Sequence, residues 1–182
     1  TLVAQMLEHS GRKVVVAGNT GIPLVSAIDS TEAEAFVVEA SSFRLGHARC
    51  FVASPAAILN FSPDHLDHHV DLDAYLLAKV RIWEGISDPR NAIANLSDPV
   101  LSRHAPSGAT GFGSDTSTCR IESGYLWFED QEVISVGEIR RSMPYDLLNA
   151  QAAVATALRF GATLQGCAQA LREFNGLTHR MS

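Results

Sequence analysis

Apolar residues occur in short unbroken runs, and polar, glycine-rich segments lie between these runs. The runs are Val14–Gly18, Ala35–Ala40, Ala56–Phe61 and Asn91–Asn95. A strand that is buried on one face alternates apolar and polar side chains, whereas unbroken apolar strands are typical of parallel sheets that are covered on both faces. The four runs therefore predict a mostly parallel sheet flanked by helices, within an α/β fold.

Helical periodicity fills the stretches around these runs. Apolar positions three and four residues apart predict helices over residues 2–8, 72–85, 144–160 and 164–174. Gly11 and Gly161 lie just beyond two of these helices, where glycine commonly ends a helix. Strands that alternate with helices indicate repeated βα units.

A different pattern covers residues 119–136, which read CRIESGYLWFEDQEVISV. The pairs SG and ED separate short apolar runs and are typical of tight turns between strands. This stretch predicts a small antiparallel annex on the main sheet. Neither an internal repeat nor a linker divides the chain, so residues 1–182 are interpreted as one domain.

The composition is that of an ordinary globular protein, with 46% hydrophobic and 19% charged residues. The net charge of −6 and the lack of a basic stretch argue against nucleic acid as a partner. The sequence contains no run of about 18 apolar residues, so no membrane span is predicted. Cys50, Cys119 and Cys167 are too widely spaced for a CxxC zinc site, and we expect them to be buried thiols of a cytoplasmic protein.

Polar clusters follow three of the predicted strands and place Asn19, Glu39, Ser41 and His65 near strand ends. Ligands of parallel α/β sheets bind beyond the carboxyl ends of the strands, so we expect these residues to lie in one region. Each cluster also has an ordinary interpretation. The GNTG segment can be a simple turn, and Glu39 can be a solvated surface carboxylate.

The segment DHLDHH, residues 64–69, combines three imidazoles with two carboxylates. Such a group suits a divalent metal or acid–base chemistry, although a polar loop with helix-capping aspartates is the alternative. A metal-dependent phosphoesterase built on this segment stays open as a rival. It would need further aspartate or histidine ligands at other strand ends, where Glu39 alone qualifies.

Lys79 lies near the centre of the apolar face of the predicted helix over residues 72–85. A lysine in that position must extend its amine to the surface, pair with another group, or lose its charge. Burial favours the neutral, nucleophilic amine. Such an amine can take up carbon dioxide and form a carbamate, an anion that can bind metal.

Five segments, in this order, resemble motifs of the Mur ligase family. They read GNTGIP, VVEASSFRL, NFSPDHLDHH followed by YLLAKVRI, NAQAA and FNGLTHR. The first two are most similar to members that add D-glutamate. The resemblance implies the P-loop NTPase-like central domain of an ATP-dependent amide ligase, which joins D-glutamate to UDP-N-acetylmuramoyl-L-alanine through an acyl phosphate in peptidoglycan synthesis. A sister or folylpolyglutamate-type ligase and a non-catalytic binding module are alternatives.

The resemblance also implies roles for particular residues. Asn19 and Ser41 would contact the UDP-linked substrate. Glu39 would bind the Mg²⁺ that also touches the ATP phosphates. His65 and a carbamylated Lys79 would serve a second Mg²⁺, and both would be catalytic.

At the other end of the chain, Asn149 and Arg180 would contact the nucleotide. The chain departs from the family pattern where Tyr145 and Asp146 replace a His-Asn pair, and where Arg44 replaces a glutamine. The motif around His69 holds one imidazole more than expected, and the resemblance gives His69 no role.

The phosphate-binding loop of the family, GxxxxGKS or GxxxxGKT, does not occur in the sequence. The resemblance places that loop just before Thr1. We therefore expect residues 1–182 to be a central domain that is incomplete at its N-terminus and separated from its neighbouring domains. By itself, such a segment is expected to be inactive.

Overall fold

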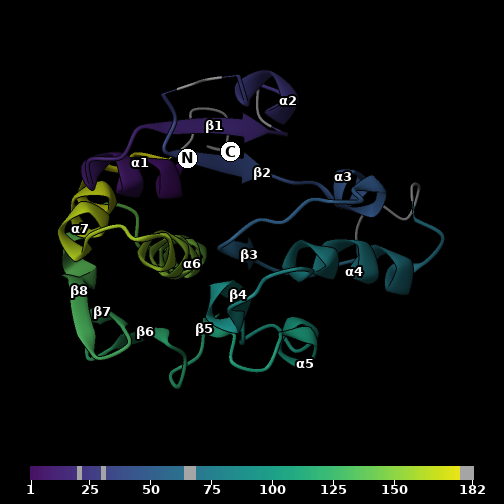
Figure 1. Ribbon diagram of the computed structural model, residues 1–182. Coiled ribbons are helices and arrows are strands. Elements are labelled where there is room, and N and C mark those ends of the chain that lie inside the picture. The colour runs from purple at the N-terminus through teal and green to yellow at the C-terminus, as the bar shows by residue number, and fades with distance from the viewer. Residues whose placement is uncertain (20–21, 30–31, 64–68, 177–182) are drawn as a thin grey trace.

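The computed structural model describes residues 1–19, 22–29, 32–63 and 69–176, and it has the expected α/β architecture (Figure 1). The strands are β1 Val14–Gly18, β2 Ala35–Glu39, β3 Ala56–Ile58, β4 Ala92–Asn95, β5 Thr110–Phe112, β6 Cys119–Glu122, β7 Tyr125–Phe128 and β8 Gln131–Ser135. The helices are α1 Leu2–His9, α2 Leu24–Ala27, α3 Ser42–His47, α4 Leu72–Val80, α5 Leu101–His104, α6 Pro144–Phe160 and α7 Leu164–Glu173. Short 3-10 turns are formed by Arg81–Trp83, Pro89–Asn91 and Val136–Glu138.

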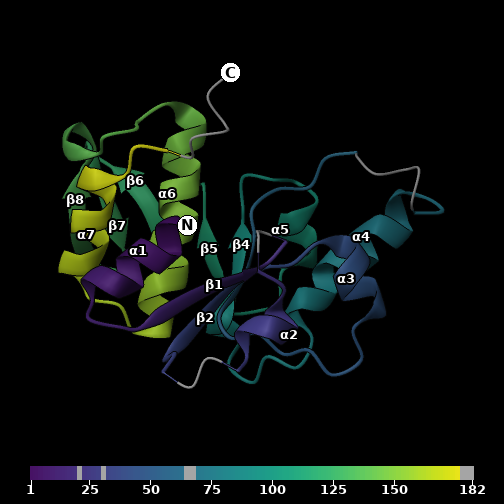
Figure 2. The ribbon, with the colours of Figure 1, turned by 90° about the horizontal axis from the view of Figure 1, so that it is seen from above.

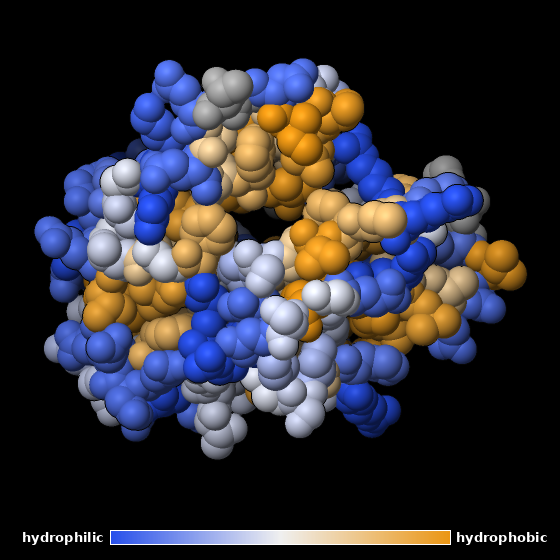
Figure 3. Space-filling model, in the orientation of Figure 1, coloured by the Kyte–Doolittle hydropathy of each residue, from blue (hydrophilic) through white to orange (hydrophobic). Residues whose placement is uncertain are grey.

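The described strands form two sheets. β1 and β2 pair in parallel, and a six-stranded sheet has the order β3-β4-β5-β6-β7-β8. In this larger sheet β3 to β6 run parallel, whereas β6, β7 and β8 form the antiparallel annex. The parallel sheet and the annex are thus confirmed, although the four predicted strands are divided between two sheets. Figure 3 shows an opening near the middle of one face of the molecule, with apolar residues around it.

The core lies on both faces of the larger sheet. On one face, Ile93 of β4 and Phe112 of β5 pack with buried residues of α1, α6 and α7. On the other face, the neighbours of Ile93 along β4 pack with Trp83 and Leu101. Successive residues of a strand point to opposite faces, so β4 is buried on both sides as its unbroken apolar run predicts. β2 departs from that expectation, because Phe36 is 36% exposed.

Two groups of helices flank the sheets (Figure 2). α1, α6 and α7 lie together on one side, and α3, α4 and α5 lie on the other. The contact between α1 and α7 is close at Gly166, where a Cβ atom would collide with the Ser10 hydroxyl. Cys119 and Cys167 are buried as expected, but Cys50 is exposed, which corrects the prediction for that residue. No helix in the described part of the chain is long and apolar enough to cross a membrane.

Candidate functional site

The ends of β1 and β2 bring Asn19 and Glu39 together. Gly18 and Glu39 are the last register partners of the two strands, and the Asn19 N–H donates to the Glu39 carbonyl at 2.9 Å. Both Asn19 and Glu39 are exposed. The strand-end clusters predicted from the sequence therefore do meet at this pair of strands, with a carboxylate and a carboxamide open to solvent.

Ser41 lies two residues after Glu39 and caps the amino end of α3. Its hydroxyl accepts the Arg44 N–H at 3.4 Å, and its backbone is extended as helix caps require. The Arg44 guanidinium donates to the Gly18 carbonyl at 3.1 Å, which ties α3 to the end of β1. Ser41 thus has a helix-capping contact in the structure, and its contact with substrate stays a prediction.

Lys79 is half-buried on α4, and its amine is paired with oxygen atoms. Nζ donates to the Asn60 carbonyl at 3.0 Å and to the Tyr75 hydroxyl at 3.4 Å. It also lies 5.3 Å from the centroid of the Tyr75 ring. Asn60 follows β3 closely, so the amine stands beyond the carboxyl end of that strand. Of the three possibilities for a lysine on an apolar helix face, the structure therefore has the paired amine.

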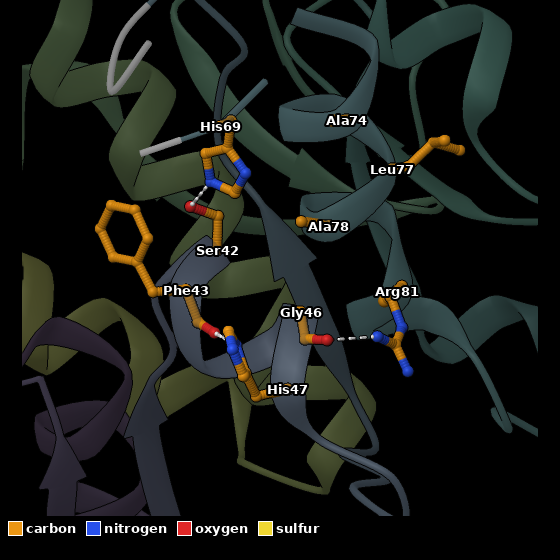
Figure 4. Close-up of a pocket in the computed structure, with 9 residues that line it drawn as sticks. All are labelled: Ser42, Phe43, Gly46, His47, His69, Ala74, Leu77, Ala78 and Arg81. Atoms are coloured by element: carbon orange, nitrogen blue, oxygen red, sulfur yellow. Dashed lines mark hydrogen bonds between the residues drawn. The ribbon is translucent and has the colours of Figure 1, made fainter. Parts of the chain in front are cut away.

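A pocket of about 340 Å³ lies between α3 and α4 (Figure 4). Its lining residues are Ser42, Phe43, Gly46, His47, His69, Ala74, Leu77, Ala78 and Arg81. The Arg81 guanidinium donates to the carbonyls of Gly46 at 2.8 Å and Ala48 at 2.9 Å. These two hydrogen bonds join the end of α4 to the end of α3. Neither Asn19 nor Glu39 nor Lys79 belongs to the described lining of this pocket.

Asn149 is exposed on α6 and lines a smaller pocket of about 50 Å³. Leu2, at the amino end of α1, lines the same pocket. Asp146, one of the departures from the family pattern, forms an ion pair with Arg141 at 3.1 Å. That carboxylate is engaged within the protein, whereas Asn149 is exposed at the pocket.

The amino end of α1 lies within electrostatic reach of Glu39. The backbone nitrogen of Thr1 lies close enough to the Glu39 carboxylate for the two groups to interact electrostatically. Because Leu2 lines the pocket of Asn149, the same helix end adjoins two of the predicted site residues. The first N–H groups of a helix have no partner within the helix, and they favour anions.

His65 and Arg180 lie outside the described residues, so their expected positions stay predictions. Within the described ranges, no three side chains of histidine, cysteine, aspartate or glutamate gather into a metal-binding group. The metal-binding roles of Glu39, His65 and Lys79 likewise stay predictions. The proposed phosphoesterase motif falls largely on residues 64–68, which the structure does not describe.

Two residues were given no individual role from the sequence: Tyr75, which contacts Lys79, and His69, which contacts Tyr75. Tyr75 precedes Lys79 by one helical turn, and residues four apart on a helix lie side by side, so the sequence does contain that signal. His69 contacts Ser42 across 27 positions, with Nε2 3.0 Å from the hydroxyl oxygen. No local pattern gives this second contact, because it depends on how α3 and α4 pack.

Comparison with known proteins identifies the family of this chain. The model of the Mur ligase middle domain matches residues 1–157. The UDP-N-acetylmuramoylalanine–D-glutamate ligase of Pasteurella multocida is 35% identical over 99% of this chain and 42% of its own length. The ligase of the same name from Chromohalobacter salexigens is 37% identical over 99% of this chain and 41% of its own length. The chain thus spans less than half the length of these relatives.

Solved structures agree on the fold. MurF from Acinetobacter baumannii superposes with a TM-score of 0.72 at 18% identity, covering 100% of this chain and 45% of that one. The UDP-N-acetylmuramate:L-alanyl-gamma-D-glutamyl-meso-diaminopimelate ligase from Neisseria meningitides gives 0.66 at 17% identity, covering 97% and 62%. With a family model that matches most of its length and relatives of the same kind along nearly all of it, this chain belongs to the Mur ligase middle-domain family.

Proposed function

We propose that this chain is the ATP-binding middle domain of a ligase that joins D-glutamate to UDP-N-acetylmuramoyl-L-alanine during peptidoglycan synthesis. The observation that carries the proposal is the 35% identity, over 99% of the chain, to a relative named for that reaction. The chain spans 42% of that relative, so the activity is proposed for a protein of the relative's length that contains this domain, called here the ligase-length protein.

The proposed reaction has two steps. A carboxylate oxygen of UDP-N-acetylmuramoyl-L-alanine attacks the γ-phosphorus of ATP, and the bond from that phosphorus to the ADP oxygen breaks. The amine of D-glutamate then attacks the carbonyl carbon of the acyl phosphate and loses a proton. The carbon–oxygen bond to phosphate breaks, which leaves an amide, ADP and inorganic phosphate. Positioning and charge stabilisation supply most of the catalysis in such phosphoryl transfers.

Glu39 and the amino end of α1 offer two of the features that a metal-bound triphosphate needs. Magnesium is usually held by one or two carboxylates together with phosphate oxygens and water, and Glu39 offers one exposed carboxylate at the end of β2. The adjoining N–H groups of α1 can donate to phosphate oxygens. When bound, Mg²⁺ would offset the charge that develops on the transferred phosphoryl group.

Lys79 is proposed to act as a carbamate, with His65, at a second Mg²⁺. The ammonium first loses a proton, and the neutral amine then adds carbon dioxide, which forms an N–C bond and releases a second proton. A cationic side chain thereby becomes an anion. The Tyr75 hydroxyl, 3.4 Å from Nζ, accepts a hydrogen bond from the ammonium and can donate one to a carbamate oxygen. The contact beside the amine thus suits both forms of Lys79.

Two further pairs complete the proposal. Asn19 and Ser41 are proposed to contact the UDP-linked substrate, and the exposed carboxamide of Asn19 beside Glu39 supports this. Asn149 and Arg180 are proposed to contact the nucleotide, and the pocket that Asn149 shares with the first turn of α1 supports the placement of Asn149. A sister ligase would use the same nucleotide chemistry with a different amino acid.

The test is the amino-acid dependence of ADP release by the ligase-length protein, with ATP, Mg²⁺ and UDP-N-acetylmuramoyl-L-alanine present. We expect D-glutamate to stimulate ADP release, whereas L-glutamate, L-lysine and meso-diaminopimelate leave it at background. Stimulation by a different amino acid would point to a sister ligase. Hydrolysis of phosphoesters without any dependence on an amino acid would favour the phosphoesterase.

A further inference from the structure

His69 lines the pocket between α3 and α4 and joins these two helices (Figure 4). Its Nε2 lies 3.0 Å from the Ser42 hydroxyl oxygen, and its ring stacks on Phe43 with centroids 5.4 Å apart and an interplanar angle of 10°. Both partners belong to α3, the helix that follows β2 and Glu39. The imidazole is therefore held through a ring nitrogen and through one ring face.

Tyr75 of α4 packs against the same imidazole. The His69 and Tyr75 centroids are 5.1 Å apart, and Phe61 lies 5.1 Å from Tyr75. Tyr75 is 6% exposed, so these two rings leave its phenol little space in which to turn. Its hydroxyl lies 3.4 Å from the Lys79 amine. A continuous series of contacts thus runs from α3 through His69 and Tyr75 to Lys79.

We infer that His69 is a positioning residue, which fixes Tyr75 and through it the amine of Lys79 relative to α3. The inference rests on the proposed role of Lys79. A lysine side chain has many rotamers, and its reactive atom is useful only if packing confines it to one region. The ring of His69 contacts both Tyr75 and α3. It therefore confines the Lys79 amine indirectly, through Tyr75.

The lysine content of the protein makes a direct test possible. The sequence has two lysines, Lys79 and Lys13, and the second is exposed and paired with Glu32 at 2.9 Å. Reductive methylation with isotope-labelled formaldehyde, read by mass spectrometry, gives the labelling rate of Lys79 relative to Lys13. This ratio reports how firmly the Lys79 amine is held, independently of any ligase activity.

We expect His69→Ala to raise the Lys79-to-Lys13 labelling ratio by about threefold or more, because the amine then samples open conformations. His69→Phe keeps a ring between Phe43 and Tyr75 but loses the hydrogen bond to Ser42, so its ratio should rise about twofold, less than in His69→Ala. The matched control is His104→Ala. His104 is an exposed histidine whose Nδ1 lies 2.9 Å from the carbonyl of Val100, the residue just before its helix, and its loss should leave the ratio unchanged.

The second readout is kinetic and uses the ligase-length protein. We expect His69→Ala to lower kcat about tenfold while the KM for ATP changes by less than about twofold, because the chemical step and not nucleotide binding depends on Lys79. His69→Phe should restore most of kcat. A role in general stability would instead lower the melting temperature and kcat together and would give no recovery with phenylalanine.

An unchanged labelling ratio in His69→Ala would overturn the inference, as would a raised ratio with an unchanged kcat. If that variant does not fold, Ser42→Ala removes only the hydrogen bond that orients the ring. It should raise the ratio about twofold, and no change there would equally overturn the inference. Absence of D-glutamate-dependent activity in the wild type is a separate outcome. It would refute the proposed function while the labelling ratio still tests the contacts around Lys79.

Discussion

Gly18 and Glu39 are the last paired residues of β1 and β2, and a Cβ atom on residue 18 would collide with the Glu39 carbonyl oxygen. Gly18 also has a φ of +107°, a conformation that favours glycine. The close approach places Asn19 beside Glu39, since the Asn19 N–H donates to the same carbonyl. The glycine is therefore part of the geometry of the candidate site.

Substitution of Gly18 by alanine should destabilise the protein through both backbone strain and collision. Gly124 is a matched control, because it has a φ of +82° but open space where its Cβ would lie. We expect Gly124→Ala to lower the free energy of unfolding by about 1 kcal/mol and Gly18→Ala by roughly 3 kcal/mol. Urea unfolding measures both values, and equal losses would show that the contact with Glu39 costs nothing.

Lys79 should carry a carbamate in the ligase-length protein when Mg²⁺ and bicarbonate are present. With ¹³C-bicarbonate, we expect one carbamate resonance from the lysines, and Lys79→Ala should abolish it while Lys13→Ala leaves it. A resonance that survives in Lys79→Ala would assign the carbamate to another amine.

The same residue should matter for catalysis. We expect Lys79→Ala to lower the ligase kcat about 100-fold or more, because charge stabilisation at a metal site is worth several kcal/mol. A small carboxylic acid added in solution should restore part of the activity by replacing the anionic group. Lys13→Ala, at an exposed position, should retain wild-type activity. Full activity in Lys79→Ala would rule out the catalytic role.

The three cysteines should divide into one reactive and two protected thiols. Cys50 is exposed, whereas burial raises the pKa of Cys167 to about 12 and also raises that of Cys119. At pH 8 a thiol reagent should modify one thiol rapidly and the other two only after unfolding, and Cys50→Ser should abolish the rapid phase. Rapid modification of two or more thiols in the folded protein would contradict this.

The same pKa shifts predict a loss of stability at high pH. A raised pKa in the folded state means that the unfolded chain loses its thiol protons first. The stabilising contribution of Cys167 is therefore complete below its ordinary pKa of 9.0 and is lost as the pH rises toward about 12. Urea unfolding between pH 8 and pH 11 should show a shallower decline in Cys167→Ala than in the wild type. Parallel declines would contradict the shift.

The long elements could be predicted from sequence because each has a repeated pattern and a clear end. α6 begins at Pro144 and ends before Gly161, whose φ is +105°, and both boundaries were predicted. The annex was predicted from its turn residues, among which Ser123 and Glu129 have positive φ values. The predicted helix over residues 72–85 is an α-helix to Val80 and a 3-10 turn to Trp83.

The elements that were missed are short. α2 and α5 have 4 residues each, α3 has 6 and β5 has 3, too few for a helical or strand period to be read. The division into two sheets was also missed, because strand pairing is set by contacts between distant segments. The meeting of Asn19 and Glu39 at neighbouring strand ends was predicted from topology. The contact from Ser42 to His69 required the packed structure.

Oxygen transfer is the most direct test of the proposed formation of an amide through an acyl phosphate. UDP-N-acetylmuramoyl-L-alanine labelled with ¹⁸O in its free carboxylate would be incubated with ATP, Mg²⁺, D-glutamate and the ligase-length protein. If the carboxylate attacks the γ-phosphorus, one ¹⁸O atom leaves with each inorganic phosphate, and mass spectrometry should find that label in step with amide formation. Unlabelled phosphate released during amide formation would contradict the account.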